Sequence, residues 1–143
     1  MNNAPPDLTR FVQAQDEGGT YARALAELRR GRKTSHWMWF VFPQIAGLGR
    51  SSMAQRYAIA SLDEARAYLA HPVLGPRLLE CASAMADATS SSAETILGDI
   101  DAQKLRSCMT LFRRADPSQP VFQKVLDKFY SGDADELTHE LLR

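Results

Sequence analysis

Cations and aromatic side chains are concentrated in one stretch of the chain, Leu28 to Leu62, which contains no aspartate or glutamate. This acid-free stretch includes Arg32, Lys33, Arg50 and the tryptophan Trp39. Cations attract phosphate or carboxylate groups, and a flat aromatic face can stack on a planar ligand. The combination is typical of a site for an anionic small molecule. The whole chain carries 17 basic and 17 acidic residues, so the remainder of the sequence is net acidic.

A glycine-spaced loop lies inside the acid-free stretch. Gly47, Gly49, Arg50 and Ser51 precede a helix candidate at 52–58. Glycines there would let backbone N–H groups converge on an anion at a helix N-terminus. The loop is not a P-loop, because no Gly-Lys-Ser/Thr follows, and it lacks the third glycine of a dinucleotide fingerprint. The alternative is a tight turn in which Ser51 only caps the helix.

Four further polar residues are candidates for ligand contacts. His36 and Gln44 stand at the two ends of the aromatic run, where either could form a hydrogen bond to a ligand. The alternative for His36 is a purely structural role. Asp101 and Lys104 are three residues apart in a predicted helix, a spacing that favours an ion pair in the first turn. This pair either lines the same site or is a capping aspartate beside a lysine that reaches solvent.

The sequence excludes several kinds of chemistry. No two histidines, and no histidine and carboxylate, have the spacing of metal ligands, so we expect no metal; no motif predicts a cofactor. There is no nucleophile elbow and no carboxylate pair suited to glycoside hydrolysis. The residue pattern therefore does not decide between an enzyme and a binding protein, and no catalytic residue is assigned.

These features give one leading hypothesis and two rivals. We expect a phosphorylated or nucleotide-like small molecule to bind in a cleft around residues 29–57. The alternative is a protein-interaction module that docks an acidic partner through the same basic patch. A single-stranded nucleic-acid binder would use the same residue types. Such proteins are usually basic, however, and the formal net charge of +0 on this chain disfavours that function. The oligomeric state is left open.

The ends and apolar runs of the sequence bear on location. The N-terminus shows no basic segment followed by an apolar run, and the apolar run Trp37–Phe42 is far shorter than the ~20 residues that span a bilayer. We therefore expect a cytoplasmic protein that does not interact with membranes. Cys81 and Cys108 have no CxxC or metal-ligand spacing, and we expect them to be reduced side chains in the core.

Helical periodicity dominates the chain and predicts an all-α fold. We expect one domain at 7–143 with about seven or eight short helices, no substantial sheet, and a disordered extension at 1–6. The apolar run Trp37–Phe42 fits either a buried strand or a buried helical turn. The helix, begun at Ser35, is favoured because no second strand-like run exists to pair with a strand.

Hydroxyl and acidic residues predict several helix starts. Ser61 and Glu64 have the spacing of a capping box, and Ser91 with Glu94 has the same spacing before a one-turn helix. A longer helix is expected to begin at Asp101.

Four segments of the sequence resemble a known family. They are LTRFVQAQ, KTSHWMWFVFPQIAGLGRSSMAQRYAI, EARAYLAHPVLGPRL and ILGDIDAQKLRSCMTLF. Together they resemble the bacterial domain-of-unknown-function family number eighteen-ten, some members of which carry the label calpastatin-like. The resemblance extends from Asp7 to Leu141 and implies a single, mainly α-helical domain, but no activity and no catalytic residue. Cys108 follows Ser107 where the family pattern implies a second serine, which argues against a hydroxyl role at that position.

Overall fold

Helices carry most of residues 7–143, the part of the chain that the computed structural model describes. Within this part there is no sheet, and Ile45 and Ile59 form one isolated parallel bridge. The prediction of an all-α fold is confirmed, whereas the predicted extension at 1–6 lies outside the described residues. The helices are α1 (Thr9–Asp16), η1 (Glu17–Gly19, a 3-10 turn), α2 (Thr20–Arg29), α3 (Met38–Val41), α4 (Ser52–Arg56), α5 (Leu62–Ala70), α6 (Leu74–Asp87), α7 (Ala93–Leu97), α8 (Asp99–Ala115), α9 (Pro120–Tyr130) and α10 (Glu136–Leu141).

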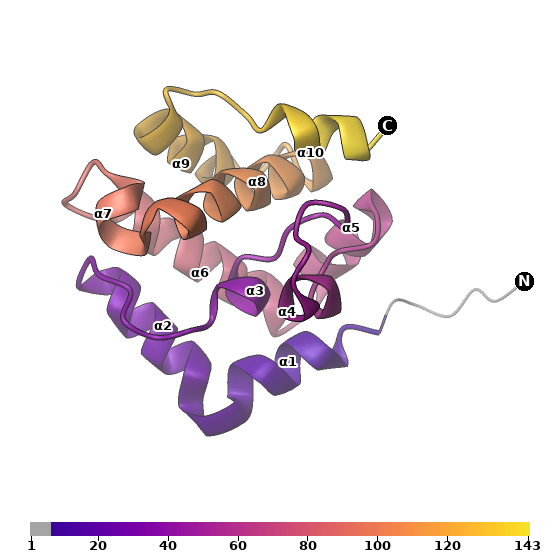
Figure 1. Ribbon diagram of the computed structural model, residues 1–143, viewed down its shortest axis with the longest axis horizontal. Helices are drawn as coiled ribbons and strands as arrows, with labels where there is room; N and C mark the ends of the chain where they lie inside the picture. Colours follow the sequence, from indigo (N-terminus) through magenta and orange to yellow (C-terminus); the bar gives the residue numbers. More distant parts are fainter. Residues whose placement is uncertain (1–6) are drawn as a thin grey trace, which may run out of the picture.

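Two long helices organise the others. The longest helix, α8, packs against α5, α7, α9 and α10, while α6 packs against α2, α5 and α9. Figure 1 shows α8 and α9 side by side on one side of the molecule, α1 and α2 on the opposite side, and α6 between them. Helix α3 and the segments around it cover the central helices from the front of this view.

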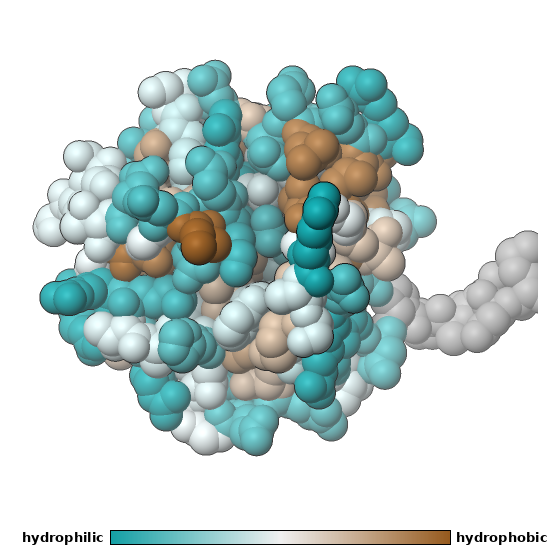
Figure 2. All heavy atoms as spheres, in the orientation of Figure 1, coloured by the Kyte–Doolittle hydropathy of each residue, from teal (hydrophilic) through white to brown (hydrophobic). Residues whose placement is uncertain are grey.

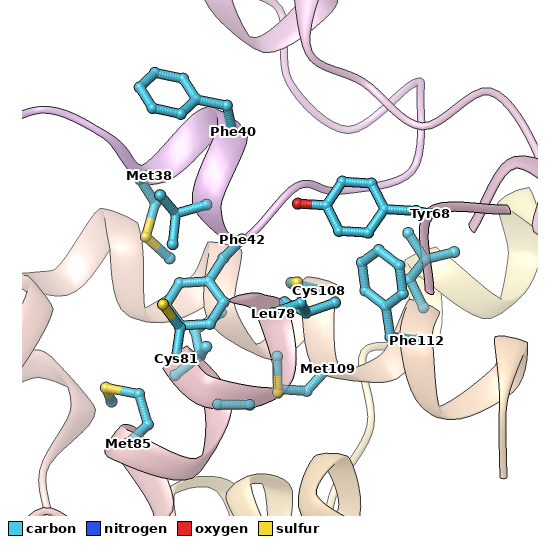
Figure 3. Close-up of a cluster of buried hydrophobic side chains, with 14 of the residues drawn as sticks. Met38, Phe40, Phe42, Tyr68, Leu78, Cys81, Met85, Cys108, Met109 and Phe112 are labelled. Carbon is cyan, nitrogen blue, oxygen red and sulfur yellow. The ribbon is translucent and has the colours of Figure 1, made fainter. Parts of the chain in front are cut away.

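The aromatic run forms a short buried helix, as predicted. Helix α3 presents Phe42, at its C-terminal end, to a cluster that includes Tyr68 of α5 and Phe112 of α8 (Figure 3). Each of these three side chains is at most 1% exposed. Burying one large apolar side chain contributes about 1.5–3 kcal/mol, so the run stabilises the centre of the fold. The helix begins after Trp37 and not at Ser35, whose side chain is engaged elsewhere.

Several caps form as the sequence predicts, and others are displaced. The Ser61 hydroxyl accepts a hydrogen bond from the Glu64 N–H at 3.1 Å, which confirms that cap. Helix α7 is capped by Ser92 instead of Ser91, because Ser92 Oγ accepts from the backbone of Thr95. Helix α8 begins at Asp99, two residues before the predicted start, because Gly98 ends α7 with a φ of 89° and leads directly into α8.

The turn between α5 and α6 depends on one glycine. A Cβ atom on Gly75 would lie 2.1 Å from the carbonyl oxygen of Leu69, so only glycine permits this close approach. Pro76 follows in the first turn of α6, where a missing N–H costs no intrahelical hydrogen bond. Helix α6 therefore runs unbroken from Leu74.

Both cysteines are free and buried, as expected from the sequence. Burial raises the pKa of Cys81 to about 12 and raises the pKa of Cys108 well above its ordinary value. Both thiols are therefore protonated near neutral pH and are poor nucleophiles. Among residues 7–143, no helix combines the length and apolar character needed to cross a membrane.

Candidate functional site

Two lysines share one carboxylate where the acid-free stretch meets helix α8. Lys33 Nζ lies 3.0 Å from Asp101 Oδ2, and Lys104 Nζ lies 3.5 Å from Asp101 Oδ1. The three side chains are only 10%, 23% and 16% exposed for Lys33, Lys104 and Asp101, respectively. We call these residues the lysine–aspartate cluster. With two ammonium groups and one carboxylate, the cluster carries an uncompensated positive charge.

Each lysine of the cluster also lies over a tryptophan ring. Lys33 Nζ is 5.2 Å from the ring centroid of Trp37, and Lys104 Nζ is 5.5 Å from that of Trp39. Both distances are within the ~6 Å range of a cation–π interaction. Trp37 is fully buried, whereas Trp39 is only partly buried at the edge of the core. The solvent-facing part of the site is therefore formed by Trp39 and Lys104.

Secondary structure and one backbone contact position the cluster. Asp101 lies in the first turn of α8, and Lys104 follows one turn later on the same side of the helix. The Lys33 N–H donates to the Ile96 carbonyl at 2.8 Å, which fastens the segment before α3 to α7. The predicted Asp101–Lys104 ion pair is present, and Lys33 of the acid-free stretch joins it.

A buried carboxylate, Glu27, holds the segment that carries Lys33 and Trp37. Glu27 Oε1 accepts hydrogen bonds from the Thr34 N–H at 2.7 Å, the Ser35 N–H at 3.1 Å and Trp37 Nε1 at 3.0 Å. The Ser35 hydroxyl donates to Glu27 Oε2. Burial alone would raise the pKa of Glu27, but these hydrogen bonds outweigh it and lower the pKa to about 2. Glu27 is therefore ionised at neutral pH.

Sequence reasoning missed Glu27 for an identifiable reason. The residue precedes the acid-free stretch by one position, on the helical turn that also carries Leu28. Its partners follow 7 to 10 residues later, a separation that no helical or capping pattern covers. Two of these partners are backbone N–H groups, which every residue except proline carries, so the residue types at 34 and 35 gave no specific signal.

The glycine-spaced loop is explained by local structure. Ser51 Oγ accepts from the Ala54 N–H at 3.1 Å and so caps α4. Gly47 has a φ of 105°, which favours glycine. The φ angle of Gly49 is not positive. A glycine is needed there because a Cβ atom would lie 2.3 Å from Ala54 Cβ. An anion-binding role for this loop stays a prediction.

Among the described residues, the other predicted site residues form no hydrogen bond or ion pair with the side chains of the cluster. Arg32, His36 and Arg50 are exposed, and within residues 7–143 their side chains form no ion pair with Asp101. Gln44 is partly buried, and its backbone carbonyl accepts from the Ile59 N–H at 2.8 Å.

One cavity of the described surface lies between α2 and α6, away from the cluster. The part of the lysine–aspartate cluster that faces solvent is the side of Lys104 and Trp39. Figure 2 shows the face that carries α3, α8 and α10 as mostly hydrophilic, with one apolar patch over α10 and smaller apolar patches elsewhere.

Comparisons with known proteins place the chain in a family. Residues 5–142 match the family described as Protein of unknown function (DUF1810), and the chain belongs to it. The resemblance inferred from the sequence motifs is thereby confirmed. No match was found among curated protein sequences.

A solved structure supports the fold. The chain is similar to the crystal structure of a conserved hypothetical protein from Mycobacterium tuberculosis, with 51% sequence identity and a TM-score of 0.91. The similarity covers 95% of this chain and 96% of that one.

Proposed function

We propose that this member of the DUF1810 family binds a small anionic molecule, phosphorylated or nucleotide-like, at the lysine–aspartate cluster beside Trp39. One observation carries the proposal: Lys33 and Lys104 share the single carboxylate of Asp101 and both are partly withdrawn from water. One positive charge is thus left without a counter-charge in a region where solvent screening is reduced. An anion supplies that counter-charge.

Lys104 is the side chain best placed to contact the ligand. An ammonium group has three donors, and the 3.5 Å separation from Asp101 is long for a hydrogen bond. Its remaining N–H groups can therefore donate to phosphate or carboxylate oxygens. The partly exposed ring of Trp39 adjoins Lys104 and offers a stacking face to a planar group such as a nucleobase.

The exposed cations have a supporting role in this proposal. Arg32 and Arg50 raise the local positive potential and so increase the association rate of an anion. We assign no reaction, because the Asp101 carboxylate is engaged by both lysines and is not free to accept a proton from a ligand. The proposal includes the cytoplasmic location expected from the sequence.

Thermal-shift measurements with nucleotides and sugar phosphates test the proposal. A ligand at 100 times its dissociation constant stabilises the folded protein by ~2.7 kcal/mol, which is readily detected as a rise in Tm. The Lys104→Met variant removes the charge and keeps the aliphatic stem, and it is expected to lose most of the ligand-induced rise. Lys124→Met on the exposed side of α9 is the matched control and is expected to keep it.

Two results would refute this binding site. One is the absence of any ligand-induced rise across the phosphorylated panel. The other is an undiminished rise in Lys104→Met.

A second candidate function is the docking of an acidic protein partner. The observation in its favour is that Arg32 and Arg50 are exposed and, within residues 7–143, form no ion pair with a carboxylate. Binding through such cations would weaken with added salt. Arg32→Gln and Arg50→Gln would reduce it, whereas Lys104→Met would leave it unchanged.

A further inference from the structure

A cavity of about 290 Å³ lies between the C-terminal end of α2 and the second half of α6. We propose that this cavity binds a small zwitterionic molecule of the α-amino acid class. The cavity shares no residue with the lysine–aspartate cluster, so the proposal is independent of the function proposed above. Its polar lining consists of two arginines, two carboxylates and two hydroxyl residues: Arg29, Arg30, Glu80, Asp87, Ser83 and Thr89.

One arginine and one carboxylate of the lining neutralise each other. Arg29 Nη2 lies 3.5 Å from Glu80 Oε2, and Glu80 Oε1 accepts a hydrogen bond from the Tyr21 hydroxyl. Each oxygen of Glu80 therefore has a partner, and the Arg29–Glu80 ion pair links α2 to α6 along one side of the cavity. It contributes no net charge to the cavity.

The other arginine and the other carboxylate remain available. Arg30 donates one hydrogen bond, from Nη2 to Thr34 Oγ1 at 3.2 Å, and its other donors are free to form the paired contacts that suit a carboxylate. Asp87, the last residue of α6, forms no ion pair within residues 7–143. The cavity lining as a whole has no net charge, but Arg30 and Asp87 each remain available to a ligand. A ligand that carries one negative and one positive group can contact both.

The size and the remaining lining restrict the ligand further. The volume lies just below the ~300–1,000 Å³ typical of drug-sized ligands, so a small molecule is expected. Gly31 lines the cavity, and no atom lies within 4 Å of the position that its Cβ would occupy, which leaves this side open. Ser83 and Thr89 are exposed and add hydroxyl groups that can hydrogen-bond to either end of a zwitterion.

Three related small molecules test the charge requirement, L-alanine and two analogues that each lack one of its charged groups. L-Alanine carries both charges, propionate lacks the ammonium group, and ethylamine lacks the carboxylate. In titrations of the ¹⁵N-labelled protein followed by NMR, L-alanine is expected to produce saturable shifts at the amides of Gly31, Ala84 and Thr89. Each analogue should bind at least about tenfold more weakly, because it loses one charge-assisted contact.

Two variants with matched controls assign the contacts. Arg30→Gln and Asp87→Asn change exposed side chains, and each is expected to weaken L-alanine binding by about tenfold or more. The controls are Arg66→Gln and Asp63→Asn, which remove the same charges at exposed positions outside the cavity. Unchanged amide spectra away from the substitution show that each variant is folded.

Three results would overturn the proposal. The first is the absence of saturable shifts with glycine, L-alanine and L-serine. The second is propionate or ethylamine binding as tightly as L-alanine. The third is L-alanine binding that survives in both Arg30→Gln and Asp87→Asn.

Discussion

Lys33 Nζ lies 3.0 Å from Asp101 Oδ2, so the acid-free stretch obtains a carboxylate partner from a helix far along the chain. Asp101 also holds Lys104 at 3.5 Å, and this shared carboxylate brings two ammonium groups together. The concentration of cations that is visible in the sequence is therefore only partly neutralised in the fold. The remaining charge is the basis of the proposed binding site.

Removing the shared carboxylate should destabilise the protein. In Asp101→Asn the two ammonium groups are left close together without a counter-charge, and we expect a loss of about 1–3 kcal/mol in the free energy of unfolding. Adding Lys104→Met to this variant should recover part of the loss, because one of the repelling charges is gone. Urea unfolding of Asp101→Asn, Lys104→Met and the double variant gives the interaction free energy between the two side chains. A change of less than about 0.5 kcal/mol in Asp101→Asn contradicts the described ion pairs.

The hydrogen bonds of Glu27 predict different costs for two substitutions. Glu27→Ala leaves the Trp37 indole N–H and two backbone N–H groups without an acceptor, and should cost about 3–5 kcal/mol. Glu27→Gln keeps an acceptor oxygen and should cost about 1–2 kcal/mol. Chemical unfolding measures both values, and equal costs would contradict the assigned contacts.

The same carboxylate predicts a pH dependence. Because the folded pKa of Glu27, about 2, lies below the ordinary value of 4.5, its ionisation stabilises the folded state. This contribution is fully present above about pH 5 and is lost as the pH falls through 4.5 toward 2. The stability difference between the unmodified protein and Glu27→Gln should therefore shrink over that range. A difference that stays constant down to pH 2 would show that the pKa of Glu27 is the same in the folded and unfolded states, which contradicts the lowered pKa.

The contact between Gly49 and Ala54 predicts a compensating pair of substitutions. Gly49→Ala would place a Cβ atom 2.3 Å from Ala54 Cβ and should destabilise the protein by about 1–3 kcal/mol. Ala54→Gly removes the obstructing atom at a helix-propensity cost of about 1 kcal/mol. The double variant should therefore be more stable than the sum of the two single effects predicts. Strict additivity in thermal unfolding argues that the two positions do not touch.

The contacts of Lys128 predict that two lysines of α9 differ in their contribution to stability. Lys128 Nζ donates to the carbonyls of Met85, at 3.2 Å, and Ala86, at 2.9 Å, and also to Ala88, where α6 ends. Lys128→Met leaves these carbonyls without their charged donor and should cost about 1–3 kcal/mol. The exposed Lys124→Met should change stability by less than about 0.5 kcal/mol. Equal changes in the free energy of urea unfolding would show that the contacts of Lys128 with the end of α6 do not stabilise the protein.

The fold was largely predictable because its signals are local. Apolar stripes and caps such as Ser61 report on neighbouring residues, and the absence of a second strand-like run correctly favoured a helix for Trp37–Phe42. The misplaced cap of α7 has a local cause too. Ser90, Ser91 and Ser92 are consecutive hydroxyl residues, and only the path of the backbone selects Ser92.

In the lysine–aspartate cluster, only the contact that follows helical spacing could be predicted from the sequence. The Asp101–Lys104 pair is an i, i+3 pair and was expected, whereas the Lys33–Asp101 contact depends on how α7 and α8 pack beside the segment before α3. The same applies to Glu27, whose partners are fixed by the turn after α2. At Gly49 the close approach of Ala54 requires a glycine, and the proposed role of this residue in anion binding stays a prediction.

The most direct test of the proposed function compares three proteins with one ligand. Isothermal titration calorimetry would measure the tightest phosphorylated ligand of the thermal-shift panel with the unmodified chain, Lys104→Met and Arg50→Gln. We predict that Lys104→Met loses about tenfold or more in affinity, while Arg50→Gln stays within about twofold, because the proposed site has Lys104 in contact with the ligand and Arg50 outside that contact. A large loss in Arg50→Gln together with unchanged affinity in Lys104→Met would contradict binding at the lysine–aspartate cluster.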